Sequence, residues 1–161
     1  MTPETALPAV ASSVHVPVDP TAAFDAFTAG IDRWWPRSHS VGSAPLARAV
    51  VEPRAGGRWY EVGEDGSECT WGEVLAWEPG ARLALSWRID GSWQADPDPA
   101  RASTVTVTFT AADGPDGRPG TRVDLVHDGF ERHARAADEL RSSVAADDGW
   151  PGLLARYAAT A

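Results

Sequence analysis

The segment from Gly56 to Trp87 constrains the fold more than any other part of the chain. It reads GGRWYEVGEDGSECTWGEVLAWEPGARLALSW, with three runs of alternating side chains separated by Asp65-Gly66 and Pro79-Gly80. Asp-Gly between alternating runs is typical of a tight β-hairpin turn. The segment therefore predicts three antiparallel strands joined by two-residue turns.

The two hairpin registers, counted separately from the two turns, agree on which side chains share a face. Because a one-residue slip moves every side chain of a strand to the other face, this agreement supports the register. We expect the inward face to hold Trp59, Glu61, Thr70, Gly72, Val74, Ala76, Leu83, Leu85 and Trp87. The outward face would hold Arg58, Tyr60, Trp71, Glu73, Leu75, Trp77, Arg82 and Arg88.

The flanking sequence supplies the other elements of the fold. Asp19 followed by Pro20 is a helix start, with Asp as N-cap and Pro at the first helical position. The segments expected before the hairpins are an edge strand over Val10–Val18, a helix from Pro20, a short helix over Ile31–Trp35, a loop over Arg37–Leu46 and a strand over Leu46–Pro53. Those expected after them are a loop over Ile89–Ala102, strands over Ser103–Thr110 and Thr121–Asp128, and a helical remainder interrupted at Gly149-Trp150-Pro151.

The links between the strands are too short for parallel crossovers, so the sheet must be antiparallel. The fold class is then α+β, with a curved sheet of six to seven strands wrapped around a long C-terminal helix. Two short helices would follow the first strand. A chain of 161 residues fits a single domain over residues 1–161, with an ordered core over about 10–158.

Composition excludes several classes of function. The net charge is −9 and no basic cluster is present, which argues against nucleic-acid and membrane-surface partners. No apolar stretch is long enough to span a bilayer, and the N-terminus does not resemble a secretory signal. Cys69 is the only cysteine and cannot form an internal disulfide, so we expect a cytoplasmic protein.

No cofactor or metal is expected. The chain has no phosphate-cradling glycine loop and no dinucleotide fingerprint. His127, Asp128, Glu131 and His133 lie close together in sequence, but their spacing matches no common zinc pattern. Ser38-His39-Ser40 lacks the Gly-x-Ser-x-Gly context of a nucleophile elbow.

The order of several motifs resembles one family over about Ser12 to Tyr157. These motifs are WWP, GGRWYE, the Gly72-Glu73-Val74 segment, WEPGARLALSW, TVTVTFT, VDLVHDGF and GWPGLLARY. Together they resemble the activator of heat-shock-protein-90 ATPase homologue family, within the START/birch-pollen-allergen (SRPBCC) helix-grip superfamily. The resemblance implies a hydrophobic cavity between the sheet and the C-terminal helix that binds apolar small molecules, and some relatives catalyse cyclisation or dehydration there.

Glu61 and His127 are the candidate catalytic residues. Each interrupts an otherwise apolar inward row, so the pair could orient a ligand's polar group or act as general acid and base. Alternatively, each hydrogen-bonds its own surroundings at the rim of the sheet. The expected ligand-binding set is Trp34, Trp35, Trp59, Glu61, Gly72, Val74, Leu85, Trp87, Val107, Phe109, Leu125, His127, Trp150 and Leu154.

Three functions remain open from the sequence. The first is binding of an apolar or aromatic small molecule in the cavity. The second is a cyclase- or hydrolase-type enzyme using Glu61 and His127. The third is a module that contacts a chaperone or regulator through the outer sheet face. That face would carry Tyr60, Trp71, Leu75 and Trp77, which could also form a homodimer interface unless Trp93 folds back over it.

Overall fold

The computed structural model describes residues 7–161, so residues 1–6 of the predicted domain lie outside the described residues. Its strands are β1 (Val10–Val16), β2 (Leu46–Val51), β3 (Arg58–Gly63), β4 (Glu68–Glu78), β5 (Arg82–Trp87), β6 (Ser103–Ala111) and β7 (Thr121–Asp128). Its helices are α1 (Pro20–Thr28), α2 (Ile31–Trp34), α3 (Ala137–Ala145) and α4 (Trp150–Thr160), with short 3₁₀ turns at Pro99–Arg101 and Phe130–Arg132.

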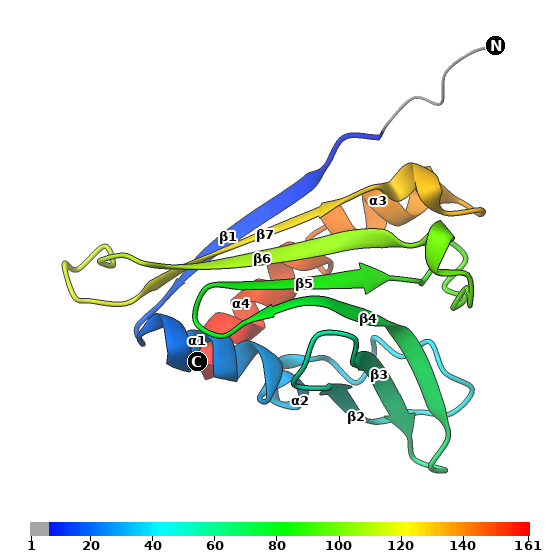
Figure 1. The fold of residues 1–161 in the computed structure, drawn as a ribbon, viewed down its shortest axis with the longest axis horizontal. Helices are drawn as coiled ribbons and strands as arrows, with labels where there is room; N and C mark the ends of the chain where they lie inside the picture. The colour runs from blue at the N-terminus through cyan, green and yellow to red at the C-terminus, as the bar shows by residue number, and fades with distance from the viewer. Residues whose placement is uncertain (1–6) are drawn as a thin grey trace.

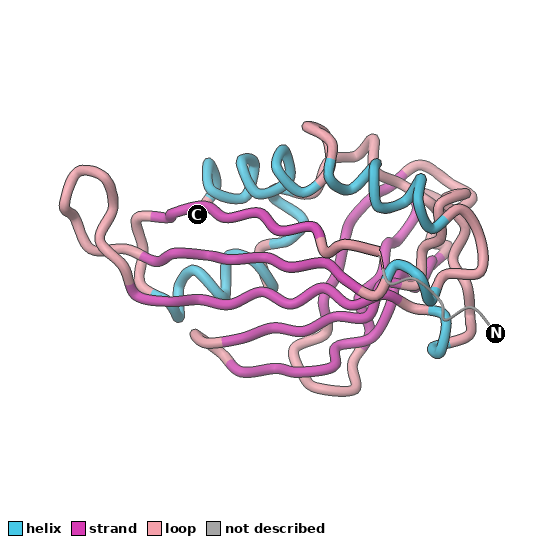
Figure 2. Tube along the Cα trace, turned by 90° about the horizontal axis from the view of Figure 1, so that it is seen from above, coloured by secondary structure: helices cyan, strands magenta, loops and turns pink. Residues whose placement is uncertain are grey.

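The seven strands form one antiparallel sheet in the order β1-β7-β6-β5-β4-β3-β2 (Figure 1). The predicted α+β class and the edge position of β1 are both confirmed. Helices α3 and α4 run along one side of the sheet (Figure 2). The C-terminal helical segment is interrupted before Trp150, as predicted, because Pro151 has no backbone N–H and fits only the first turn of a new helix. No helix within residues 7–161 is long and apolar enough to cross a membrane.

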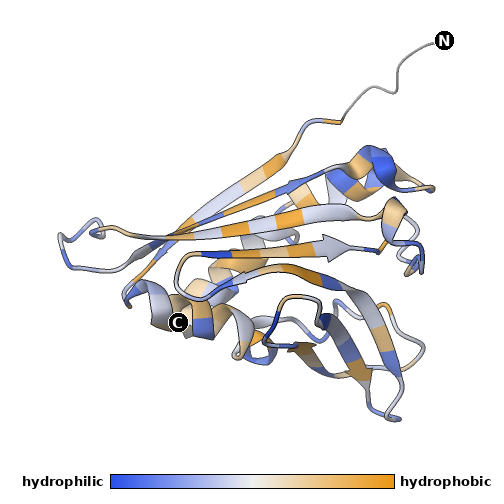
Figure 3. Cartoon of the chain, in the orientation of Figure 1, coloured by the Kyte–Doolittle hydropathy of each residue, from blue (hydrophilic) through white to orange (hydrophobic). Residues whose placement is uncertain are grey.

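Alternating side chains build the core as the sequence indicates. Val105, Val107 and Phe109 of β6 are buried, while the threonines between them are more exposed. Figure 3 shows the matching alternation of hydrophobic and more polar residues along the strands. Asp19 begins α1 as predicted, because its carboxylate accepts a hydrogen bond from the Ala22 N–H at 2.8 Å. The phenylalanines of α1 then pack on the concave face, where Phe24 lies 5.3 Å from Phe109.

The two predicted two-residue turns are wrong. The Gly63 N–H donates to the Ser67 carbonyl at 2.7 Å, and Glu78 pairs with Arg82, so each loop contains three residues. Gly66 and Gly80 adopt φ of +84° and +76°. Gly66 is the last residue of its loop, the left-handed position that follows a type I turn. Gly80 is the middle residue of its loop, at the position where a type II turn after Pro79 requires a positive φ. Asp-Gly and Pro-Gly therefore fit three-residue loops as well as shorter ones.

Two β-bulges in β4 compensate for the longer loops. The register shifts by one residue at Trp71 and again at Leu75, which restores the predicted pairs of Trp59 with Gly72 and of Val74 with Leu85. A bulge breaks strict alternation, because two residues of one strand face a single residue of its partner. Trp71 therefore turns inward, although the sequence predicts it on the outer face.

The predicted aromatic outer face is consequently wrong. Trp71 is buried, and Trp77 packs edge-on against Phe24 at 4.9 Å. Tyr60 is covered by the guanidinium of Arg58, 4.1 Å from its ring centre. Only Leu75 of the four predicted residues is exposed. The expected homodimer or chaperone surface thus lacks its aromatic side chains.

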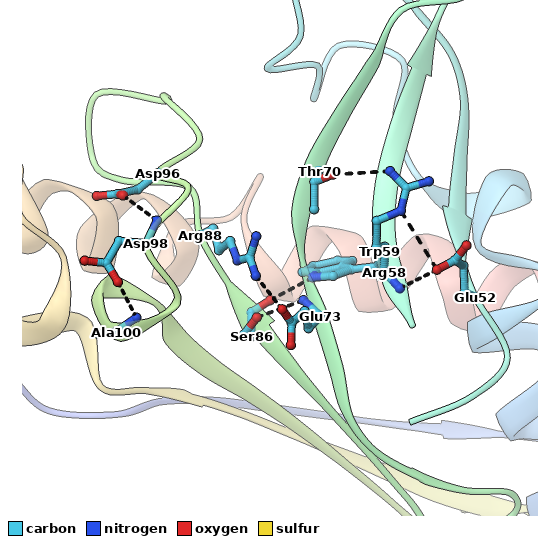
Figure 4. Close-up of polar contacts among 10 residues, drawn as sticks. All are labelled: Glu52, Arg58, Trp59, Thr70, Glu73, Ser86, Arg88, Asp96, Asp98 and Ala100. Atoms are coloured by element: carbon cyan, nitrogen blue, oxygen red, sulfur yellow. Dashed lines mark hydrogen bonds and ion pairs between the residues drawn. The ribbon is translucent and has the colours of Figure 1, made fainter. Parts of the chain in front are cut away.

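Trp59 joins three strands at Gly72. Its indole starts on β3, crosses β4 over Gly72, and donates its N–H to the Ser86 carbonyl of β5 at 2.7 Å (Figure 4). A side chain at Gly72 would collide with both the Ser86 carbonyl and the Trp59 indole. The glycine predicted to leave space for a ligand therefore accommodates the protein's own backbone and indole.

Gly72→Ala should destabilise the fold by about 3 kcal/mol or more, because neither the strand backbone nor the indole can move aside cheaply. Gly66→Ala is the matched control. Its added methyl would meet no atom within 4 Å, so only the left-handed backbone opposes it, at about 1 kcal/mol. Urea unfolding measures both, and equal losses in the two variants would contradict the close packing at Gly72.

Candidate functional site

A pocket of about 720 Å³ lies between the sheet, the α3–α4 junction and two loops. The sheet side contributes Trp71 from the bulge of β4 and Trp87 from the end of β5. The remaining lining residues are Trp35, Ser38, His39, Ser40, Val41, Ile89, Trp93, Ser142, Ser143, Val144, Ala146, Asp148, Gly149, Trp150 and Leu153. The pocket thus has an aromatic interior and serines, His39 and Asp148 around it.

Five buried tryptophans form a cluster with a continuous row of ring contacts at this pocket, and Trp34 contacts Trp35 on the side away from the pocket, at 5.7 Å between ring centres. Neighbouring ring centres are 4.8 Å apart for Trp35 and Trp71, 5.3 Å for Trp71 and Trp59, 5.6 Å for Trp59 and Trp87, and 5.7 Å for Trp87 and Trp150. None is more than 5 % exposed. Such tilted and edge-on contacts suit aromatic rings and hold the cluster rigid.

Every indole N–H of the cluster is bonded inside the protein. Three donate to backbone carbonyls: Trp35 to His39 at 3.2 Å, Trp59 to Ser86 at 2.7 Å and Trp87 to Ile89 at 2.8 Å. The other two donate to side chains, Trp71 to Glu61 and Trp150 to His127, both at 3.0 Å. The indoles that line the pocket therefore present ring surface and no free donor.

Glu61 is fully engaged as a hydrogen-bond acceptor. Besides the Trp71 N–H, its carboxylate accepts from the Ser40 hydroxyl at 2.7 Å and from the backbone N–H groups of Val41 at 2.7 Å and Gly42 at 3.1 Å. The side chain is 1 % exposed and does not line the pocket. It joins the loop after α2 to β3 and to the bulge of β4.

Glu61→Gln should cost about 1 to 3 kcal/mol of stability, because a neutral amide oxygen accepts more weakly than the carboxylate from the Val41, Gly42 and Trp71 N–H groups. Because Glu61 holds residues 40–42 in place, the backbone amides of these residues should also exchange hydrogen faster in the variant. Glu64→Gln makes the same chemical change at an exposed hairpin position and should leave both quantities unchanged. Wild-type urea midpoints in both variants would disprove the anchoring role of Glu61.

His127 belongs to a separate buried network. Its Nδ1 receives the Trp150 N–H at 3.0 Å, so its Nε2 carries the proton and donates to the Ser103 hydroxyl at 2.7 Å. The Ser103 hydroxyl also lies within hydrogen-bond distance of Nε2 of His133, at 2.8 Å. Hydrogen bonds therefore connect Trp150, His127, Ser103 and His133, and the bond to His127 fixes the orientation of the Trp150 indole.

Both histidines in this network are held neutral. Burial, reinforced by the nearby His133, lowers the pKa of His127 to about 3. Burial also lowers the pKa of His133, although Asp90 and Asp96 oppose the shift. Nδ1 of His133 is buried without a hydrogen-bond partner among residues 7–161. A neutral His127 that is wholly buried orients Trp150 and does not reach the pocket.

Acid should therefore unfold the protein partly through His127. In the unfolded chain its imidazole takes up a proton near pH 6.5, whereas in the folded protein it does so only near pH 3. Stability is thus lost as the pH falls through this window, by about 2 to 3 kcal/mol between pH 7 and 4.5. His127→Gln should be less stable at pH 7 yet show a shallower pH dependence in urea unfolding. If the free energy of unfolding changed with pH equally in wild type and His127→Gln, His127 would not be the group responsible.

The structure separates the predicted ligand-binding residues into two groups. Trp35, Trp87 and Trp150 line the pocket. The other predicted residues are inside the protein and do not line it: Trp34, Trp59, Glu61, Gly72, Val74, Leu85, Val107, Phe109, Leu125, His127 and Leu154. Trp34, for example, packs 5.0 Å from Phe27 and donates its N–H to the Ala26 carbonyl. Glu61 and His127 lie in different hydrogen-bond networks.

Several pocket residues escape prediction from sequence. Trp71 is missed because its bulge breaks the alternation that assigns it outward. Ser38, His39 and Trp93 lie in loops without periodicity, so only their residue types could suggest a site. Among the described residues, no three His, Cys, Asp or Glu side chains are grouped to hold a metal ion.

Comparisons with known structures agree with this architecture. The chain is 40 % identical to an anthrahydroquino-gamma-pyrone synthase, Txn09, complexed with SUM, covering 99 % of this chain and 100 % of that one, with a TM-score of 0.66. It is 37 % identical to the self-sacrificing resistance protein CalC from Micromonospora echinospora, covering 94 % and 92 %, with a TM-score of 0.65. The Aha1 dimer from Colwellia psychrerythraea shares the fold at 12 % identity, 92 % coverage of both chains and a TM-score of 0.58.

A search of curated protein sequences finds no match. The model of the family described as activator of Hsp90 ATPase homolog 1-like protein matches residues 17–161. That match covers nearly the whole sheet and both C-terminal helices. The chain therefore belongs to the activator of Hsp90 ATPase homolog 1-like family.

Proposed function

We propose that this protein binds a planar, apolar aromatic small molecule in the pocket between the sheet and the α3–α4 junction. One observation carries the proposal: the four buried indoles of the lining have all their N–H groups bonded within the protein. They can offer a ligand only their ring surfaces. Flat aromatic rings make the best use of such surfaces, through stacked and edge-on contacts.

Size and polarity support the same ligand class. A volume of about 720 Å³ falls within the range of small-molecule sites, which are mostly apolar with a few polar groups. Besides Ser40, whose hydroxyl is bonded to Glu61, the polar side chains of the lining are Ser38, His39, Ser142, Ser143 and Asp148. They could meet hydroxyl or carbonyl groups at the edge of a ring system while its faces contact tryptophan.

The relatives favour a ligand of this kind. Txn09 is named as an anthrahydroquino-gamma-pyrone synthase, and a compound of that name is a fused, flat ring system. CalC is named as a resistance protein. The 40 % identity to Txn09 over nearly whole chains supports a pocket of similar use in this protein, and the 37 % identity to CalC supports the same fold.

Catalysis in the same pocket is the second candidate function, favoured by the likeness to a synthase. His39 is the one histidine of the lining, and its ring nitrogens lie 3.2 Å from the Ser38 hydroxyl and 2.9 Å from the Asp148 carbonyl. It is better placed as acid or base than Glu61 or His127, which do not line the pocket. Mass spectrometry of incubations with anthrahydroquinone precursors tests this: His39→Gln should still bind the precursor and lose its conversion.

Binding is tested with 1,8-dihydroxyanthraquinone in equilibrium dialysis. Wild type should bind it saturably at one site. Ser143→Trp places a large indole within the pocket lining and should weaken binding at least ~10-fold by occupying the ligand's space. Thr108→Trp adds the same indole at an exposed position of β6 outside the pocket and should bind as wild type does.

Two results would count against the proposal. Non-saturable uptake by wild type would show that the compound merely partitions onto the protein. Saturable binding that Ser143→Trp leaves unchanged would place the compound elsewhere. Thermal unfolding of both variants in the absence of the compound shows whether either has lost its fold.

A further inference from the structure

We propose that Trp93 is a ligand-binding residue that covers the pocket and stacks on the bound aromatic ring. The inference rests on the proposed function, because it names a side chain that selects flat rings at that same site. Trp93 lies in the loop between β5 and β6 and contributes to the lining of the pocket.

Trp93 differs from the other pocket indoles in its exposure. It is 47 % exposed, whereas Trp35, Trp71, Trp87 and Trp150 are at most 5 % exposed. No partner for its indole N–H is found within residues 7–161. A large apolar ring left in water at the edge of an aromatic pocket gains contact area when a flat ligand enters. The four buried indoles have far less surface left to cover.

The backbone conformation of Trp93 is unfavourable for a large side chain. Its φ is +59°, a left-handed conformation that is rare and strained for a large side chain. The loop holds it there, because the Asp90 carboxylate accepts from the N–H groups of Ser92 at 2.8 Å and Gln94 at 3.1 Å. Asparagine or glycine would fit this position with less strain. Strain retained at a pocket residue is typical of a functional position.

The base of the loop is attached to the segment that leads into α3. The Gly91 N–H donates to the Arg135 carbonyl at 3.1 Å, and Gly91 packs so closely on Ala136 that a side chain would not fit. Ala136 is itself left-handed, with φ of +51°. Helix α3 begins at the next residue and supplies Ser142, Ser143 and Val144 to the pocket. The loop and α3 thus border the pocket as one connected unit, with Trp93 at the tip of the loop.

The experiment compares wild type, Trp93→Asn and Trp93→Phe with 1,8-dihydroxyanthraquinone as probe. Asparagine tolerates the left-handed backbone, so Trp93→Asn should unfold thermally at or above the wild-type temperature while the probe's Kd rises ~10- to 100-fold. Trp93→Phe keeps an aromatic face and should stay within about threefold of the wild-type Kd. Kd comes from equilibrium dialysis and the unfolding temperature from calorimetry.

A merely structural indole gives the opposite pattern. In that case Trp93→Asn lowers the unfolding temperature and leaves the Kd of the folded protein unchanged, which overturns the inference. Unchanged affinity in Trp93→Asn beside saturable wild-type binding overturns this inference alone and leaves the proposed function standing. Absence of saturable binding in wild type overturns both.

Discussion

One buried carboxylate holds the pocket side of this molecule together. Glu61 accepts four hydrogen bonds, three from residues 40–42 and one from Trp71. Burying a carboxylate is costly unless its acceptor positions are filled, so β3 can keep this residue inside only when the loop and the bulge of β4 are both in place. The loop at Ser38–Val41 and the indole of Trp71 are two walls of the pocket. The site therefore depends on a residue that a ligand does not touch.

The strands and helices of the fold follow from local sequence patterns, whereas the details of strand pairing do not. Alternation in β6 and β7 and the Asp19-Pro20 helix start are direct consequences of side-chain spacing and capping. The hairpin loops differ because Asp-Gly and Pro-Gly suit loops of two or three residues alike. The longer loops would have reversed the faces of β4, and the two bulges prevent this midway along the strand. A bulge has no signature at Trp71 or Leu75, since it is set by which side chains the finished core can accommodate.

In the candidate site, too, local sequence patterns predict some residues, whereas tertiary contacts determine the others. Trp35, Trp87 and Trp150 are predictable because they follow recognisable elements, while Trp93 and His39 lie in loops whose course depends on tertiary contacts. His127 is correctly expected inside from its place on β7. Ser103 lies on β6 and His133 follows the Phe130–Arg132 turn, so the sequence alone does not show that they meet His127. It also does not show that both ring nitrogens of His127 are hydrogen-bonded, one of them to Trp150. Of the two interpretations that the sequence allows for Glu61 and His127, the structure matches the one in which each residue hydrogen-bonds its own surroundings.

The buried polar groups behind the pocket are hydrogen-bonded within the protein, and this affects how the pocket can bind a ligand. Glu61 and His127 accept from two of the buried indoles, and the other indoles of the cluster donate to backbone carbonyls. The inner walls are therefore rigid and present apolar surface to a ligand. Rigid walls lose little entropy on binding, so ring contact translates into affinity more fully than it would in a flexible pocket. Among the indoles of the lining, only Trp93 is exposed and has a left-handed backbone, and its loop is packed against the start of α3 through Gly91. The buried tryptophans restrict the shape of the ligand that fits, and the exposed indole of Trp93 provides the apolar surface that becomes buried when the ligand binds.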